Sequence, residues 1–184
     1  ENNPFKLIYI SSLEFYKHQW HVVEAVTSLK YEGLPIELDL YGAPNKGPLK
    51  KLKQVIDKHD GSDAYVKYYE ETNFSEIHKI YQQSDLSIFA SSCETFGQIV
   101  LESMASGLPI ACSNASSMQE IIKDGCVYFD PLNPQNIADS IRSLLLSPSL
   151  RKSVATKAHD YAKEFSWQKT SNQTFKFLKE ITEG

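Results

Sequence analysis

The sequence predicts an α/β domain in which helices cover both faces of a parallel sheet of six strands. Short apolar runs, rich in β-branched and aromatic residues, alternate along the chain with longer stretches of helical periodicity. Such alternation favours a doubly wound parallel sheet. The 184 residues are enough for one domain with a sizeable core, whereas two domains of ordinary size would need a longer chain.

The first half of the chain holds three of the predicted strands. The first is Phe5–Ile10, an apolar and aromatic run. A loop over Ser11–Tyr16 follows, and Gly33 ends the helix after it. The remaining elements predicted in this half are a helix over Lys17–Tyr31, a strand over Ile36–Tyr41, a helix over Pro48–His59, a strand over Tyr65–Tyr68 and a helix over Phe74–Gln83.

The second half begins with a buried strand over Leu86–Ala90, which leads into the most informative stretch of the sequence, Ser91–Pro109. Pro109 stands early in the next strand, as strand ends allow. The other elements predicted here are a strand over Leu108–Cys112, a short helix capped by Ser116 or Ser117 and running through Ile122, a strand over Cys126–Phe129, helices from Pro134 onward with breaks near Pro148 and Phe165, and a last helix over Trp167–Ile181 with Trp167, Phe175 and Leu178 on its apolar side.

Six such strands fit the Rossmann-like order 3-2-1-4-5-6, in which ligands bind at the carboxyl edge beside the switch between strands one and four. The loops expected at that switch are Ser11–Tyr16 and Ser91–Gly97. The order therefore predicts that Lys17 and Glu94 lie close together, although they are far apart in sequence.

Two carboxylates flank a predicted helix start within Ser91–Pro109. Glu94 precedes the turn at Gly97, and Glu102 follows on the helix. Free N–H groups at a helix start suit an anion, and a carboxylate can accept hydrogen bonds from vicinal hydroxyls. The pattern indicates a ligand that is both phosphorylated and rich in hydroxyls. The alternative is that each glutamate is an ordinary surface residue. A glycosidase pair is disfavoured, since it needs carboxyls on opposite sides of one glycosidic bond.

Lys17 is a second indication, because a lysine in the first turn of a helix is unfavourable against the helix dipole. A diphosphate held between this lysine and the helix N–H groups would supply a reason, and simple solvent exposure is the alternative. Asn114–Met118 forms another loop on the same edge that could line the pocket or cap a helix.

The composition excludes several classes of function. The net charge of −4 gives no reason to expect nucleic-acid binding. The three cysteines form neither a CxxC pair nor an even set, so a reducing, cytoplasmic compartment is expected. His18 and His21 lie one helical turn apart but have no evident third metal ligand. The first residue is Glu1 rather than Met, and we expect a piece of a longer protein.

The stretch Glu94-Thr95-Phe96-Gly97 through Glu102, a Glu-x7-Glu pattern followed by Ser103–Pro109, closely resembles the signature of retaining GT-B glycosyltransferases of family 4. The similarity extends over nearly the whole chain. Further matching pieces are the first-strand loop with Lys17, Tyr41-Gly42, Tyr81–Leu86, Gln119–Ile122 and Phe165-Ser166-Trp167.

The resemblance implies that residues 1–165 are the nucleotide-sugar-binding domain, the C-terminal half of a GT-B fold. Residues 166–184 would then be a helix that crosses back to an N-terminal acceptor domain outside this chain. It further implies transfer with retention to a glycan or lipid-linked acceptor, in cell-surface polysaccharide synthesis, with no essential metal or cofactor. The full-length protein would act in the cytoplasm or at the cytoplasmic face of a membrane.

The resemblance also assigns residues to the donor. The catalytic Glu94 would contact the donor sugar and Glu102 the ribose. Lys17 and the backbone after Phe96-Gly97, at Gln98 and Ile99, would hold the diphosphate. Ser12 is also expected among the donor-binding residues. It occupies the place where many relatives carry an arginine, so diphosphate binding would be weaker or compensated elsewhere.

Two rival functions keep the fold. A nucleotide-sugar epimerase or a phosphorylase-like enzyme would need acid and base residues around the sugar, or a lysine-bound cofactor, and neither is visible in the sequence. A non-catalytic phosphate-binding domain would tolerate loss of Glu94.

Overall fold

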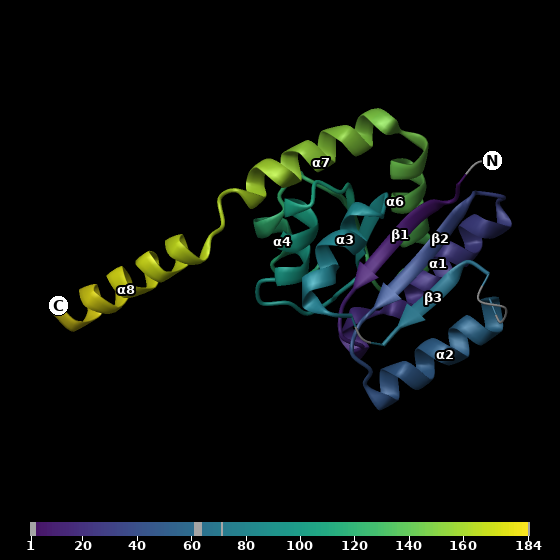
Figure 1. Cartoon of the computed structure of the whole chain (residues 1–184), viewed down its shortest axis with the longest axis horizontal. Helices are drawn as coiled ribbons and strands as arrows, with labels where there is room; N and C mark the ends of the chain where they lie inside the picture. The colour runs from purple at the N-terminus through teal and green to yellow at the C-terminus, as the bar shows by residue number, and fades with distance from the viewer. Residues whose placement is uncertain (1–2, 61–63, 71, 184) are drawn as a thin grey trace.

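The computed structural model describes residues 3–60, 64–70 and 72–183. It contains a six-stranded parallel sheet in the order β3-β2-β1-β4-β5-β6, which confirms the predicted topology (Figure 1). The strands are β1 (Phe5–Ile10), β2 (Ile36–Tyr41), β3 (Val66–Tyr69), β4 (Leu86–Phe89), β5 (Ile110–Ser113) and β6 (Val127–Phe129).

β1 is the central strand, and its alternating side chains enter two separate clusters. Leu7 and Tyr9 belong to the main hydrophobic core, which also contains Val22 and Val26 of helix α1 (Gln19–Tyr31). Ile8 points to the opposite face and packs with Tyr81 of α3 (Ile77–Gln82). Both faces of β1 are therefore covered, as the alternation of strands and helices along the sequence predicted.

The other helices complete the two layers beside the sheet. α1 contacts both α2 and α6, whereas α4 contacts α7. Proline at the first turn and a side-chain cap mark the starts of α6 and α7, where Asn133 accepts from Asn136 N–H and Ser147 from Leu150 N–H. The bounds of these other helices are α2 (Lys46–Asp60), α4 (Gln98–Ala105), α5 (Met118–Ile121), α6 (Pro134–Leu146) and α7 (Pro148–Ala162).

Two predicted helices are shorter than expected because each is preceded by a 3-10 turn. The predicted helix over Phe74–Gln83 is a turn at Phe74–Glu76 followed by α3. The predicted helix over Lys17–Tyr31 is a turn at Phe15–Lys17 followed by α1. His18 separates that turn from α1 because its φ of 50° is left-handed.

The last helix, α8 (Trp167–Glu183), extends away from the body of the molecule (Figure 1). Trp167, Phe175 and Leu178, which were predicted to lie on its apolar side, are exposed, and none of its residues is buried. Trp167 is 82% exposed and Phe175 is 70% exposed. The chain is last anchored at Phe165, which packs partly buried against the core.

Candidate functional site

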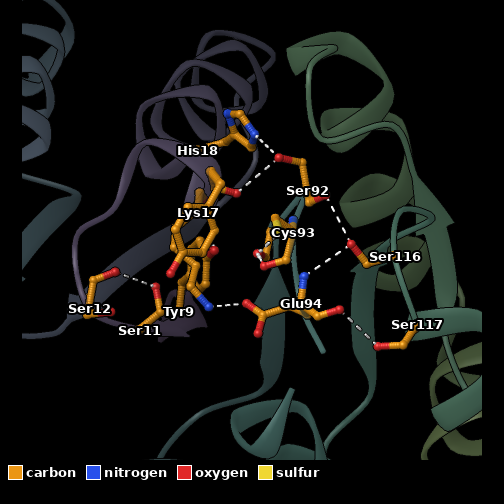
Figure 2. Close-up of polar contacts among 12 residues, drawn as sticks. Tyr9, Ser11, Ser12, Lys17, His18, Ser92, Cys93, Glu94, Ser116 and Ser117 are labelled. Atoms are coloured by element: carbon orange, nitrogen blue, oxygen red, sulfur yellow. Dashed lines mark hydrogen bonds and ion pairs between the residues drawn. The ribbon is translucent and has the colours of Figure 1, made fainter. Parts of the chain in front are cut away.

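Three loops meet at the carboxyl edge of the sheet (Figure 2). They follow β1, β4 and β5, and β1 pairs directly with β4. This is the switch point of the strand order, where ligands of open α/β sheets bind. The strand order and the Glu94–Glu102 pattern together predicted a ligand site at this edge, and that ligand site stays a prediction.

The loop after β1 is held against the end of β2. Ser11 N–H donates to Tyr41 C=O at 2.8 Å, and Leu13 N–H donates to Ala43 C=O at 3.0 Å. A side chain at Gly42 would place its Cβ 1.8 Å from the Ser11 carbonyl oxygen. Only glycine fits at this position, and it allows the two chains to run side by side beyond the sheet.

Lys17 does not lie in the first turn of a helix, and that prediction is wrong. Its N–H donates to Glu14 C=O at 3.0 Å, which closes the 3-10 turn before His18. The buried Tyr9 hydroxyl donates to Lys17 C=O at 2.7 Å. A turn and a buried tyrosine therefore fix Lys17, and the helix-dipole argument does not apply to it.

Lys17 and Glu94 form an ion pair, which confirms that they are neighbours despite a separation of 77 residues (Figure 2). Their side chains are only 8% and 15% exposed. The ammonium group also lies 5.1 Å from the centre of the Phe89 ring. An ammonium group carries three N–H donors. Glu94 occupies one of them in this structure, so Lys17 keeps donors for a further anion.

Hydroxyl groups from the loop after β5 hold the backbone of Glu94. Glu94 N–H donates to Ser116 Oγ at 3.1 Å, and Ser117 Oγ donates to Glu94 C=O at 3.4 Å. Ser116 Oγ also donates to Ser92 C=O at 3.0 Å. The prediction that Ser116 or Ser117 caps a helix is wrong, because Ser117 stands at the start of α5 without a side-chain cap bond. The loop does reach the backbone of residues 92–94, and its lining of a ligand pocket stays a prediction.

His18 joins the loops after β1 and β4. Its Nε2 lies 2.8 Å from Ser92 Oγ, and Ser92 N–H donates to Tyr16 C=O at 2.8 Å. Burial lowers the pKa of the His18 imidazole, with further lowering by His21 and Lys51. None of His18, Ser92 and Tyr9 was predicted from the sequence to be a site residue. His18 and Ser92 are 74 positions apart, and a hydrogen bond between such distant residues leaves no periodic pattern in the sequence. The only sequence feature that indicated this cluster is the pair of serines in the Asn114–Met118 loop.

The start of α4 presents free donors to the same edge. Gly97, with φ 76°, occupies the N-cap position, and its carbonyl accepts from Val100 and Leu101. Within the described part of the chain, the N–H groups of Gln98 and Ile99 donate to no protein acceptor. These groups form the positive end of the helix dipole. Phe96, just before the turn, packs edge-to-face on Phe165 with ring centres 5.5 Å apart.

Glu102 does not join Glu94. It lies one turn into α4 and lines a groove of about 580 Å³ between α3 and α4. Burial raises the pKa of the Glu102 carboxyl, and the neighbouring Gln98 amide partly offsets this. The groove is lined by Ser75, Ile77, His78, Tyr81, Gln82, Glu102, Ala105 and Ser106. The two glutamates therefore lie in two different regions, one beside Lys17 and one against α3.

Ser12 is exposed and lies on the side of Ser11 away from Glu94 (Figure 2). Its carbonyl accepts from the Gln19 amide at 3.1 Å and from the Ser11 hydroxyl at 3.2 Å. A hydrogen bond thus ties the backbone of Ser12 to α1. The contact of Ser12 with a nucleotide-sugar donor stays a prediction.

Among the residues that the structure describes, no three His, Cys, Asp or Glu side chains are placed to share a metal ion. None of the helices described is long and apolar enough to cross a membrane.

Known proteins resemble this chain in sequence and fold. It is 25% identical over 179 residues to a D-inositol 3-phosphate glycosyltransferase of Corynebacterium urealyticum, an alignment that covers 94% of this chain and 42% of the relative. Anabaena HepE, solved in complex with UDP and glucose, shares the fold with a TM-score of 0.86 and 22% identity, over 96% of this chain and 48% of HepE.

The pneumococcal O-GlcNAc transferase GtfA, solved with UDP and GlcNAc, has a TM-score of 0.81 at 22% identity, over 100% of this chain and 37% of GtfA. The chain thus spans less than half the length of these proteins. The family model of glycosyl transferases group 1 matches residues 1–161. This match covers the whole six-stranded sheet and the helices packed on it, and the chain belongs to the glycosyl transferases group 1 family.

Proposed function

We propose that this chain is the nucleotide-sugar-binding part of a retaining glycosyltransferase of family 4, equivalent to the C-terminal half of a GT-B enzyme. One observation carries the proposal. The little-exposed Lys17–Glu94 ion pair lies at the same sheet edge as the open N-terminus of α4. A cation, unpaired N–H donors and a carboxylate together match a ligand with both phosphates and hydroxyls.

Each group then has a role toward the donor. Lys17 and the N–H groups of Gln98 and Ile99 hold the diphosphate, where charge-assisted hydrogen bonds are strong. Glu94 accepts hydrogen bonds from the hydroxyls of the sugar. The nucleoside occupies the groove beside α3, where Glu102 accepts hydrogen bonds from the ribose hydroxyls.

The same groups favour the reaction. In transfer with retention, the bond from the anomeric carbon to the phosphate oxygen breaks, and the acceptor oxygen adds on the same face. The acceptor proton passes to the leaving phosphate oxygen, so the protein supplies no nucleophile. Negative charge grows on the diphosphate as the bond breaks. Lys17 and the α4 N–H groups stabilise that charge where it develops.

The acceptor side belongs to a domain outside this chain. In this proposal residues 1–165 bind the donor. The segment 166–184 contains α8, which packs its apolar side on the acceptor domain. The acceptor is a glycan or lipid-linked glycan of a cell-surface polysaccharide, and the protein acts in the cytoplasm. HepE and GtfA were each solved with UDP and a sugar, which supports a nucleotide-sugar donor here.

The test is calorimetric titration of this chain with UDP-, GDP- and ADP-sugars. We expect the sugar nucleotides of one base to bind. Glu102→Gln should weaken that binding about tenfold, since it removes a charged hydrogen-bond acceptor. Glu180→Gln, on the exposed α8, is the matched control and should not change the affinity. If no nucleotide sugar binds, or if both variants behave alike, the assignment is wrong.

Lys17→Met separates the diphosphate from the nucleoside. It removes the cation but keeps an apolar stem of similar length, so affinity for the free nucleoside should persist while affinity for the diphosphate falls tenfold or more. Lys152→Met, exposed on α7, is the control.

The chain alone should bind donor without measurable transfer to added glycans, and turnover by the chain alone would contradict the division into two domains.

A further inference from the structure

Ser116 has an unusual backbone for a serine. It lies in the loop after β5, with a left-handed φ of 58°. Residues with a Cβ are disfavoured in this conformation, and glycine is the usual choice. A serine kept there indicates that its side chain contributes something glycine lacks.

That contribution is a hydroxyl used both as donor and as acceptor. Ser116 Oγ accepts from Glu94 N–H at 3.1 Å and donates to Ser92 C=O at 3.0 Å. The adjacent Ser117 Oγ reaches Glu94 C=O at 3.4 Å. The loop after β5 therefore holds the backbone of Glu94 on both sides (Figure 2).

The network continues from Ser92 to the loop after β1. Ser92 contacts His18 through its hydroxyl and Tyr16 through its N–H. These two residues flank Lys17. Ser116 is thus bonded directly to one partner of the Lys17–Glu94 pair and, through Ser92, to the neighbours of the other.

We propose that Ser116 is a positioning residue, which orients Glu94 toward the donor sugar through the backbone of residues 92–94. The proposal rests on the proposed function, because it needs Glu94 to meet the sugar. The competing explanation is that Ser116 only stabilises its loop. The two explanations differ in a measurable way, since a positioning role alters discrimination of the sugar and a stabilising role alters unfolding.

The experiment compares Ser116→Gly with Ser116→Ala. Glycine removes the hydroxyl and relieves the left-handed backbone, whereas alanine removes the hydroxyl and keeps the strain. Thermal unfolding should therefore give a higher melting temperature for Ser116→Gly than for Ser116→Ala. Lys123→Gly is the matched control, because Lys123 also has a left-handed φ, of 52°, at the turn between α5 and β6.

The functional readout is a ratio of two dissociation constants, that of UDP-glucose over that of UDP. UDP-N-acetylglucosamine with UDP, and GDP-mannose with GDP, are titrated in parallel. Both Ser116 variants should change this ratio about tenfold while affinity for the free diphosphate stays within twofold. In a Glu94→Gln background the same substitutions should change nothing further, because Ser116 acts through Glu94. Lys123→Gly should leave the ratio unchanged.

The outcomes are distinct. If the unmutated chain binds no nucleotide or nucleotide sugar, the proposed function fails and this inference with it. If it binds them and Ser116→Gly leaves the ratio within twofold, only this inference fails. An equal change of the ratio with and without Glu94→Gln would likewise overturn it, since Ser116 would then act independently of Glu94. If Ser116→Gly does not fold, Ser116→Ala decides by the same criteria.

Discussion

At the scale of single residues, His18 combines strain, burial and a titratable ring. Its backbone is left-handed, with φ 50°, and its ring stacks on His21 with centres 5.3 Å apart. Nε2 bonds to Ser92, whereas the buried Nδ1 has no hydrogen-bond partner among the residues that the structure describes. Burial lowers the pKa of this imidazole below its ordinary 6.5, as do His21 and Lys51, while Asp130 opposes the shift. The neutral ring is therefore the form that fits the folded chain.

This shift has a consequence for stability. Below pH 6.5 the unfolded chain binds a proton at His18 that the folded chain resists, so the free energy of unfolding is fully retained above pH 6.5 and falls as the pH is lowered. His18→Asn, which tolerates the left-handed backbone and cannot titrate, should flatten that fall between pH 6.5 and 5. Urea unfolding at several pH values measures it. His159→Asn, on the exposed part of α7, should keep the full fall, and an unchanged slope in His18→Asn would refute the assignment.

At the scale of elements, α4 has a glycine at each end, and both have a φ of 76°. An added Cβ at Gly97 would lie 2.8 Å from Cε of the fully buried Met118, whereas at Gly107 it would meet nothing within 4 Å. Gly107→Ala should therefore cost only the backbone strain, about 1–2 kcal/mol. Gly97→Ala should cost more, because Met118 must also shift.

The two variants should also differ in binding. Gly97→Ala disturbs the donors at Gln98 and Ile99, so under the proposed function its affinity for the nucleoside diphosphate that the chain binds should fall, while Gly107→Ala binds as the unmutated chain does. Guanidinium unfolding and titration with that nucleoside diphosphate measure the two effects. Equal unfolding free energies together with equal affinities would show that the start of α4 is neither crowded nor part of the site.

The elements and the site differed in how far they could be predicted. Alternation of apolar runs with helical periodicity was enough to predict β1–β6 and their order, and the order alone brought Lys17 to Glu94. The 3-10 turn before His18 escaped prediction, because a single residue with positive φ leaves no periodic trace. The bonds among Ser116, Ser92 and His18 escaped for a related reason, since they depend on loop geometry that forms only after the sheet assembles.

At the scale of the whole molecule, α8 is an appendage on a folded body. None of its residues is buried, so a chain ending at Phe165 should lose helical signal but keep its free energy of unfolding within about 0.5 kcal/mol. Circular dichroism during guanidinium unfolding measures both. A chain ending at Leu146 is the contrasting control. It also lacks α7, which buries Val154 and Ala158, and it should be strongly destabilised. Equal loss in both truncations would mean that α8 packs on the body in solution.

The left-handed residues bear on how this protein could be evolved in the laboratory. His18 and Ser116 both belong to the cluster around Lys17 and Glu94, and glycine would relieve the backbone at either position. A library selected only for heat resistance should therefore be enriched in substitutions at the proposed donor site. Thermal robustness and sugar recognition would be in competition at that edge of the sheet, and selection for both would direct improvement to other parts of the chain.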